Sequence, residues 1–181
     1  QNANRAANLV RQLLAFSRQQ TLQPRLLDLT ELLAELSHLL RRLIGANIEL
    51  RLTQSAEVSH IKADQGQMEQ VLINLVVNAR DAMPQGGKLM VRTRNVTTYE
   101  PLKIGADETL PAGKWVAIEV EDTGTGIPAD VLPRIFDPFF STKEVGAGTG
   151  LGLATVHGIV HQTGGFIGVN TTIGTGTTFS I

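Results

Sequence analysis

The sequence predicts an α/β two-layer sandwich, in which a mixed sheet carries helices on one face. Helical and strand-like patterns alternate along most of the 181 residues. The last strands follow one another closely and are separated by glycine-rich turns, which is typical of antiparallel hairpins. Apolar residues make up 42% of the chain and charged residues 18%, which fits one globular core with a short appendage.

Composition excludes several classes of protein. The formal net charge is −1, so the chain offers no basic surface for nucleic acid. It contains no cysteine, which excludes disulfides and thiolate metal sites. No apolar run reaches the roughly 18 residues of a membrane span and no signal peptide opens the chain, so we expect a cytoplasmic domain. Both ends fall inside helical or strand patterns, so we expect a longer parent, whose membrane anchoring is left open.

Residues 1–20 predict one helix, because no proline or glycine interrupts the chain before Pro24. Its apolar stripe consists of Leu9, Val10, Leu13, Leu14 and Phe16. A lone helix cannot bury such a stripe, so this helix needs a partner. It is either an ordinary core helix or the last helix of a dimerising bundle, and the linker-like residues 21–27 favour the bundle.

The globular domain is expected to occupy residues 28–181. A second helix is predicted up to residue 43, with Asp28 or Thr30 as its N-cap and leucines at helical spacing on its buried face. Alternating apolar and polar residues predict a strand over 48–52, and a shorter strand is expected at 58–62.

A third helix, over residues 65–82, carries an unusual polar face. Asp64 is its expected N-cap, and Asn74, Asn78 and Asp81 share one side because they are spaced four and three positions apart. Most of the remaining circumference is apolar. The polar face therefore points either to solvent or, as we favour, to a ligand. Asn78 offers a hard carbonyl oxygen of the kind that suits Mg²⁺.

The rest of the domain is predicted to consist mainly of strands. A turn at 84–87 precedes a strand at 88–95, in which Leu89, Val91 and Thr93 share one side. Residues 96–113 contain two prolines and two glycines, so we expect a long irregular connection. The later elements are a strand at 115–120, a helix at 150–163 and strands at 166–170 and 177–181.

Residues 122–152 carry the strongest functional signal. Asp122 ends a predicted strand just before Gly124 and Gly126, and a second run of glycines leads into a helical pattern at 146, 148, 150 and 152. Glycine allows close backbone approach to a ligand, and a helix start presents N–H groups to an anion. The spacing is neither that of a P-loop nor that of a dinucleotide-binding unit. We favour a nucleotide pocket with a lid over a ligand-free glycine loop.

Four motifs within residues 25–181 resemble the catalytic ATP-binding domain of bacterial sensor histidine kinases, in the gyrase, Hsp90, histidine kinase and MutL superfamily. They are QVLINLVVNARDAM (70–83), DTGTGIP (122–128), FDPFFSTK (136–143) and GAGTGLGLATV (146–156), followed by GTGTTF (174–179). The resemblance implies a Bergerat-type ATP-binding fold. Residues 9–20 are similar to the second helix of the dimerisation and phosphoacceptor domain, and the STK sequence suits hybrid kinases, including alphaproteobacterial cell-cycle kinases.

The resemblance implies roles for individual residues. Asp122 would accept a hydrogen bond from the adenine amino group of ATP or ADP, with Thr177 in support through water. Asn78 would bind Mg²⁺ and Asn74 would lie beside the phosphates, while Lys143 could reach the γ-phosphate and complete the catalytic set. The other nucleotide-binding residues would be Asp81, Gly124, Gly126, Gly148, Thr149, Gly150, Leu151 and Gly152. The phenylalanines of the third motif would either fix the lid or belong to the core.

Two departures from the family pattern bear on activity. ATP-hydrolysing members of the superfamily carry a glutamate one helical turn before the magnesium-binding asparagine, where this chain has Asn74, which cannot act as a base. The motif of the phosphoacceptor histidine does not occur in the sequence. The four histidines, His38, His60, His157 and His161, lie outside any such motif and are expected to be surface or hydrogen-bonded residues.

The leading hypothesis is a protein-histidine kinase domain. The alternatives are an ATPase or conformational switch of the same fold, disfavoured by Asn74, and a docking module that binds no ATP, disfavoured by the intact motifs. The resemblance implies a dimerisation bundle and a receiver domain as partners, and a homodimeric parent. It also implies regulation by cyclic di-GMP, for which Tyr99, Lys103 and Trp115 are candidate contacts, although the connection could equally be a simple loop with Trp115 against the sheet.

Overall fold

The computed structural model describes residues 22–55, 57–105, 108–143 and 148–181. The helix predicted over 1–20 and the glycine at 146 lie outside the described residues.

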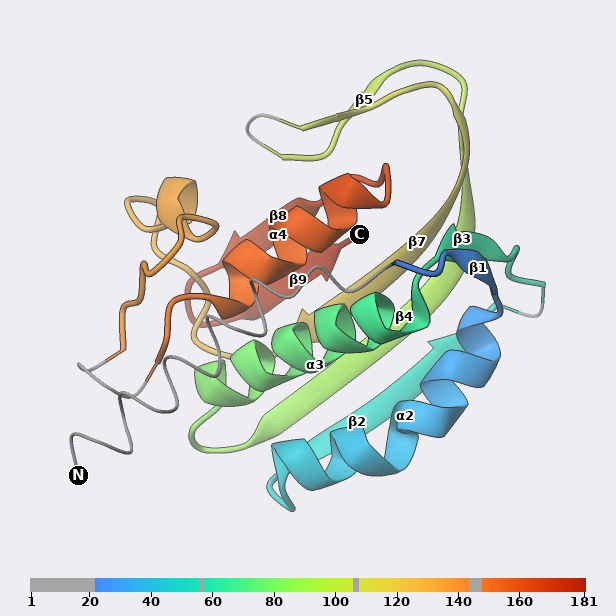
Figure 1. The fold of residues 1–181 in the computed structure, drawn as a ribbon. Helices are drawn as coiled ribbons and strands as arrows, with labels where there is room; N and C mark the ends of the chain where they lie inside the picture. The colour runs from blue at the N-terminus through green and yellow to red at the C-terminus, as the bar shows by residue number, and fades with distance from the viewer. Residues whose placement is uncertain (1–21, 56, 106–107, 144–147) are drawn as a thin grey trace.

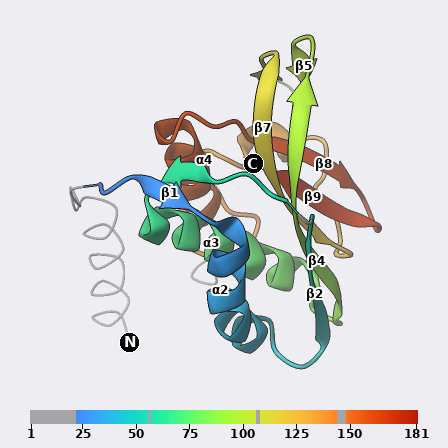
Figure 2. The same ribbon diagram turned by 90° about the vertical axis from the view of Figure 1, so that its right-hand side faces the viewer.

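A five-stranded mixed sheet forms one layer of the domain. Its strands are arranged in the order β2-β4-β7-β9-β8. They span Ile48–Gln54 (β2), Gly87–Thr98 (β4), Gly113–Asp122 (β7), Gly176–Ser180 (β9) and Gly168–Thr172 (β8). The β2–β4 pair is parallel and the other pairs are antiparallel. The helices cover one face of this sheet (Figure 1, Figure 2), so the predicted two-layer fold is confirmed.

Three α-helices form the second layer: α2 (Leu29–Ile44), α3 (Gln65–Ala82) and α4 (Gly152–Gln162). The carboxylate of Asp28 accepts hydrogen bonds from the N–H groups of Thr30 and Glu31, so Asp28 is the N-cap of α2. Asp64 caps α3 in the same way. Helix α3 lies in the middle of the layer, packs against both α2 and α4, and buries its apolar stripe. Among the described helices, none is both long and apolar enough to cross a membrane.

A short strand at the start of the described chain was not expected from the sequence. Residues Arg25–Leu27, within the predicted linker, form β1 and pair antiparallel with β3 (Ile61–Ala63). Leu27 is buried, and the N–H of Gln23 donates to the carboxylate of Asp64. Three residues are too few for a sequence alternation to indicate a strand.

The prediction of a long irregular connection over 96–113 was wrong. Strands β4 and β7 pair without interruption from Leu89–Asp122 to Thr98–Gly113, and the hairpin continues as β5 (Leu102–Lys103) and β6 (Thr109–Leu110). Cross-strand ion pairs stabilise it, because Arg92 and Arg94 both contact Glu119. The prolines and glycines therefore shape a hairpin rather than break it.

Two phenylalanine-motif residues show how the segment between β7 and α4 is attached. This segment contains the 3₁₀ helix η1 (Leu132–Arg134). Phe136 packs against the core and lies 4.9 Å from the ring of His157, while Phe140 lies beneath the guanidinium of Arg134 at 4.4 Å. Phe139, in contrast, is 62% exposed. Phe136 thus anchors this segment to the core, and we call residues 137–143, which follow it, the lid.

Candidate functional site

A pocket of about 560 Å³ lies where α3, the ends of β7 and β9, the lid and the start of α4 meet. Most of the residues predicted to bind nucleotide line it. They are Asn74, Asn78, Asp81, Asp122, Gly126, Lys143, Gly148, Thr149, Gly150, Gly152 and Thr177. Gly124 and Leu151 do not line the pocket. Gly124 packs so closely on α3 that a Cβ there would lie 2.6 Å from the carbonyl oxygen of Ala82, and Leu151 is buried.

Asp122 lies on the pocket floor, where β7 ends. Its side chain is almost fully buried, and its Oδ1 accepts hydrogen bonds from the N–H groups of Gly124 (2.8 Å) and Thr177 (3.3 Å). Burial raises the pKa of the Asp122 carboxyl, and these two N–H groups only partly offset the rise. No hydrogen bond from a described residue reaches Oδ2, so this oxygen is available to a ligand donor in the pocket.

A hydroxyl pair lies behind Asp122 and includes a residue that the sequence analysis missed. Thr171 faces Thr177 across β8 and β9, and their hydroxyl oxygens are 3.0 Å apart. The Thr171 hydroxyl also accepts from the N–H of Ile127 at 2.8 Å, which ties the segment after β7 to β8. A threonine in a strand of alternating pattern gives no functional signal until the register pairs it with another residue.

The pocket walls are apolar above the carboxylate. The side chains on these walls, also not predicted, are Val77, Ile127, Val131, Ile135, Leu153 and Phe179. A cavity that combines these apolar side chains with the buried carboxylate of Asp122 suits an aromatic ring that carries an amino group.

The two asparagines of α3 have different surroundings. Asn74 is fully engaged: its Nδ2 donates to the carbonyl of Gly152 at 3.1 Å, and its Oδ1 accepts from Gln70 at 3.0 Å. Asn78 lies one turn later, and its buried Nδ2 has no hydrogen-bond partner among the residues that the structure describes. A buried polar group without a partner costs about 1–3 kcal/mol, so a ligand is expected to satisfy the Asn78 amide.

Asp81 and Lys143 join α3 to the lid by an ion pair. Arg80 also contacts Asp81, at 2.6 Å. Burial raises the pKa of Asp81, but the hydrogen bonds from Lys143 and Arg80 outweigh it, and the net pKa is lowered. Lys143 is therefore held at the pocket rim by a carboxylate in this structure.

Within the glycine-rich residues 148–152, the backbone conformation and close packing at position 150 require glycine. Gly150 has a φ of +66°, and a Cβ there would clash with the backbone of Phe139. The Gly150 carbonyl accepts from the N–H of Phe139 at 2.9 Å. The close approach thus binds the lid to the residues just before α4. Among the described residues no side chain caps α4, and its first residue, Gly152, lines the pocket.

Comparison with known proteins decides the family. Residues 63–181 match the model of the family described as "Histidine kinase-, DNA gyrase B-, and HSP90-like ATPase". This chain belongs to that ATPase family. The predicted resemblance to histidine kinase domains is confirmed by this match and by similar sensor kinases and solved histidine kinase structures.

Two curated relatives are sensor kinases. Sensor kinase CckA of Brucella abortus (strain 2308) is 60% identical over 181 residues, which is 100% of this chain and 19% of that protein. Sensor histidine kinase ZraS of Escherichia coli (strain K12) is 42% identical over 134 residues, 74% of this chain and 25% of that protein. The ATPase-family chain thus spans about a fifth to a quarter of the length of these relatives.

Solved structures agree with the fold. Full-length ShkA in complex with AMPPNP is 28% identical with a TM-score of 0.67, over 88% of this chain and 30% of that chain. The catalytic domain of the histidine kinase ThkA is 29% identical with a TM-score of 0.65, over 88% of this chain and 93% of that chain.

We expect Gly150→Ala to disrupt the lid of this ATPase-family domain. Alanine at position 150 would have to adopt a positive φ, and its Cβ would have to displace the backbone of Phe139. Together these two costs should lower the free energy of unfolding by about 1–3 kcal/mol. The matched control is Gly158→Ala in the middle of α4, where no atom lies within 4 Å of the new Cβ. That variant should gain about 0.5–1 kcal/mol. Thermal unfolding of both variants measures these stabilities. Equal changes in stability in the two variants would contradict the inferred tight packing of Gly150 against Phe139.

The three candidate effector residues do not form one aromatic platform. Trp115 packs edge-on against Phe166 at 5.3 Å and donates its indole N–H to the carbonyl of Pro111. Tyr99 is 90% exposed just after β4, and Lys103 is exposed in β5. Trp115 thus packs within the domain, whereas the simple loop that was the alternative prediction is replaced by paired strands.

Proposed function

We propose that this chain binds Mg²⁺-ATP and donates the γ-phosphoryl group to a histidine on a dimerisation and phosphoacceptor domain. The observation that carries the proposal is the buried carboxylate of Asp122, which keeps one oxygen free at the floor of an apolar pocket. The names of the relatives support it, because they are sensor kinases, and a neighbouring structure holds AMPPNP.

The pocket offers a different environment to each end of the nucleotide. Oδ2 of Asp122 accepts a hydrogen bond from the adenine amino group, and the apolar walls cover the ring. Thr177 donates its N–H to Oδ1 and so holds the carboxylate in place. The phosphates meet Gly148 to Gly152 and the N-terminal end of α4, where free N–H groups and the helix dipole favour negative charge.

The residues around Asn78 fit a magnesium ion. Asn78 lines the pocket, and no described residue donates a hydrogen bond to its Oδ1, an amide oxygen of the hard kind that suits Mg²⁺ beside phosphate oxygens. Its buried Nδ2, which has no partner among the described residues, would donate to a phosphate oxygen. Asn78 would hold the ion, and the bound ion would neutralise charge on the phosphate oxygens. Lys143, which pairs with Asp81 in this structure, would exchange that carboxylate for the γ-phosphate.

The site lacks a base that could activate water for hydrolysis at the position of Asn74. This amide cannot take a proton, and both of its ends are occupied, by Gly152 and Gln70. Instead, Asn74 links α3 to the start of α4 through its hydrogen bond to the carbonyl of Gly152. In the proposed transfer, the bond between the γ-phosphorus and the bridging oxygen breaks, a bond to an imidazole nitrogen forms, and ADP leaves. This favours a kinase over an ATPase or conformational switch.

Nucleotide selectivity tests the proposal. We expect Mg²⁺-ATP at about 100 times its Kd to raise the melting temperature by about 5–10 °C. Mg²⁺-GTP should give little shift, because guanine presents a carbonyl where adenine presents an amino group. Equal shifts with ATP and GTP would contradict adenine recognition by Asp122.

Labelled ATP tests the second half of the proposal. The 181-residue chain alone should acquire no acid-labile label, because the phosphoacceptor motif does not occur in its sequence. A separate helix bundle with a phosphoacceptor histidine should become labelled in its presence. Label on this chain alone would show that one of its own histidines accepts phosphate.

Further expectations from the resemblance stay predictions. These are a receiver domain as partner, a homodimeric parent, and regulation by cyclic di-GMP through Tyr99 and Lys103. The cytoplasmic location expected from the sequence also stays a prediction. The exposed Tyr99 ring is compatible with stacking on a nucleobase.

A further inference from the structure

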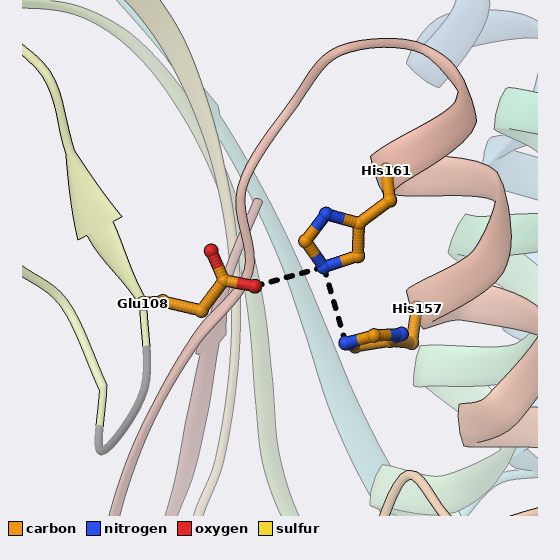
Figure 3. A group of neighbouring side chains, drawn as sticks. All are labelled: Glu108, His157 and His161. Carbon is orange, nitrogen blue, oxygen red and sulfur yellow. Dashed lines mark hydrogen bonds and ion pairs between the residues drawn. The ribbon is translucent and has the colours of Figure 1, made fainter.

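A cluster of three metal-ligating side chains lies outside the nucleotide pocket. His157 and His161 come from α4, and Glu108 comes from the residues just before β6 (Figure 3). The two histidines are four positions apart, so they share one face of the helix. Their side chains converge with that of Glu108, and the ligand atoms all lie within 4.8 Å of one another. None of the three lines the pocket that contains Asp122.

The hairpin is held in the position that this cluster requires. A Cβ at Gly168, where β8 begins, would clash with the carbonyl of Ile104, which follows β5. The N–H of Ile104 donates to the carbonyl of Glu108 at 3.0 Å, which closes the tip. The approach of Glu108 to α4 therefore rests on backbone packing as well as on its own side chain.

Hydrogen bonds alone do not satisfy the cluster well. Nε2 of His161 lies 2.8 Å from a carboxylate oxygen of Glu108 and 3.1 Å from Nε2 of His157. An imidazole nitrogen has a single in-plane direction, for either a hydrogen or a lone pair. It cannot donate to Glu108 and accept from His157 at the same time. Three atoms thus compete for one proton, whereas a cation between them would interact with all three.

The geometry and the ligand atoms suit zinc. With Zn–N distances near 2.0–2.1 Å, two nitrogens in a tetrahedral site are separated by about 3.3 Å, close to the observed spacing. An imidazole nitrogen binds zinc through its lone pair, so each histidine can supply one ligand atom. The ring of Phe136 covers one side of His157.

We propose that Glu108, His157 and His161 form a zinc-binding site that fastens the β5–β6 hairpin to α4. The three side chains supply two nitrogens and one oxygen, and water completes a tetrahedral set. Because α4 begins at Gly152 in the nucleotide pocket and His157 contacts the lid anchor Phe136, the ion would stabilise the helix on which both depend.

Zinc chloride titration by calorimetry tests the proposal, on the 181-residue chain without nucleotide, because ATP itself chelates zinc. We expect one ion per chain and a higher melting temperature with zinc than without it. His161→Gln and Glu108→Gln should each lower the zinc affinity at least tenfold, because losing even a hydrogen-bond partner of a metal ligand typically costs about 10- to 100-fold. His38→Gln, an exposed histidine on α2, is the matched control and should bind as the wild type does. Stabilisation by Mg²⁺-ATP, measured separately, checks that each variant folds.

Cobalt(II) provides a second readout. A tetrahedral site should give intense visible absorption bands with Co²⁺, and these should disappear in His161→Gln but persist in His38→Gln. Two results would overturn the proposal. One is the absence of saturable zinc binding to the wild-type chain. The other is binding that survives Glu108→Gln unchanged, which would leave the hairpin outside the site.

Discussion

Asp122→Asn should weaken ATP binding by about 10- to 100-fold. A hydrogen bond to a charged group contributes about 1.5–3 kcal/mol, and each 1.4 kcal/mol is a factor of ten in affinity. The substitution keeps the shape of the side chain, and the amide oxygen can still accept from Gly124 and Thr177. The amide nitrogen, however, would face the adenine amino group, so two donors would meet. Preference for ATP over GTP should therefore disappear as well.

Calorimetry with Mg²⁺-ATP measures this loss, and Asp130→Asn is the matched control. Asp130 lies exposed in the same segment and does not line the pocket, so the control removes the same charge without touching the ligand. ATP affinity within twofold of the wild type in Asp122→Asn would exclude the carboxylate as the adenine contact.

The raised pKa of Asp122 gives the same variant a second signature. Because its native pKa lies above the unfolded value, protonation favours the folded state, and the stabilising contribution is lost as pH rises through the native pKa. Asp122→Asn removes this titration, so without nucleotide the variant should gain stability relative to the wild type as pH rises. ATP binding should follow the opposite trend in the wild type, since only the ionised carboxylate is a full acceptor. Thermal unfolding of both proteins, measured from below the unfolded pKa of Asp122 to above its native pKa, tests the expected difference in stability.

Asn78→Ala should remove most of the magnesium dependence of ATP binding. Metal stabilisation of phosphoryl transfer amounts to several kcal/mol, so losing even about 3 kcal/mol would slow transfer to a separate phosphoacceptor bundle by about 100-fold. Affinity measured without magnesium should change little, because the Asp122 contact remains. Removal of the amide should also cost little stability before ligand binds, since its buried Nδ2 has no partner to lose.

Titrations of ATP with and without Mg²⁺ separate these effects. Asn170→Ala, an exposed asparagine on β8, is the matched control and should retain the wild-type magnesium response. If Asn78→Ala also retained that response, Asn78 would have a structural role and the magnesium ligand would lie elsewhere.

The sequence by itself determined the fold class and predicted most of the residues that line the pocket. The spacing of Asn74, Asn78 and Asp81 placed them on one face of α3, and Asp122 was correctly expected at the end of its strand. These inferences succeed because helix and strand periodicities, capping residues and glycine-rich turns act over a few neighbouring positions. The motif spacing added the family, which the comparison confirmed.

Only the tertiary structure decided which partner each of these side chains has. The amide of Asn74 makes hydrogen bonds with Gly152 and Gln70, whereas the buried Nδ2 of Asn78 has no partner among the described residues, and residue spacing alone gives no sign of this difference. Likewise, the pairing of Thr171 with Thr177 depends on strand register.

The β4–β7 hairpin and the cluster of Glu108, His157 and His161 also depend on tertiary structure. Prolines and glycines over 96–113 indicated an irregular connection, but pairing along the whole of β4 and β7 outweighed these local signals. Glu108 meets His157 and His161 only because the hairpin folds back onto α4. Such contacts arise from the packing of segments far apart in the chain, which local periodicity does not encode.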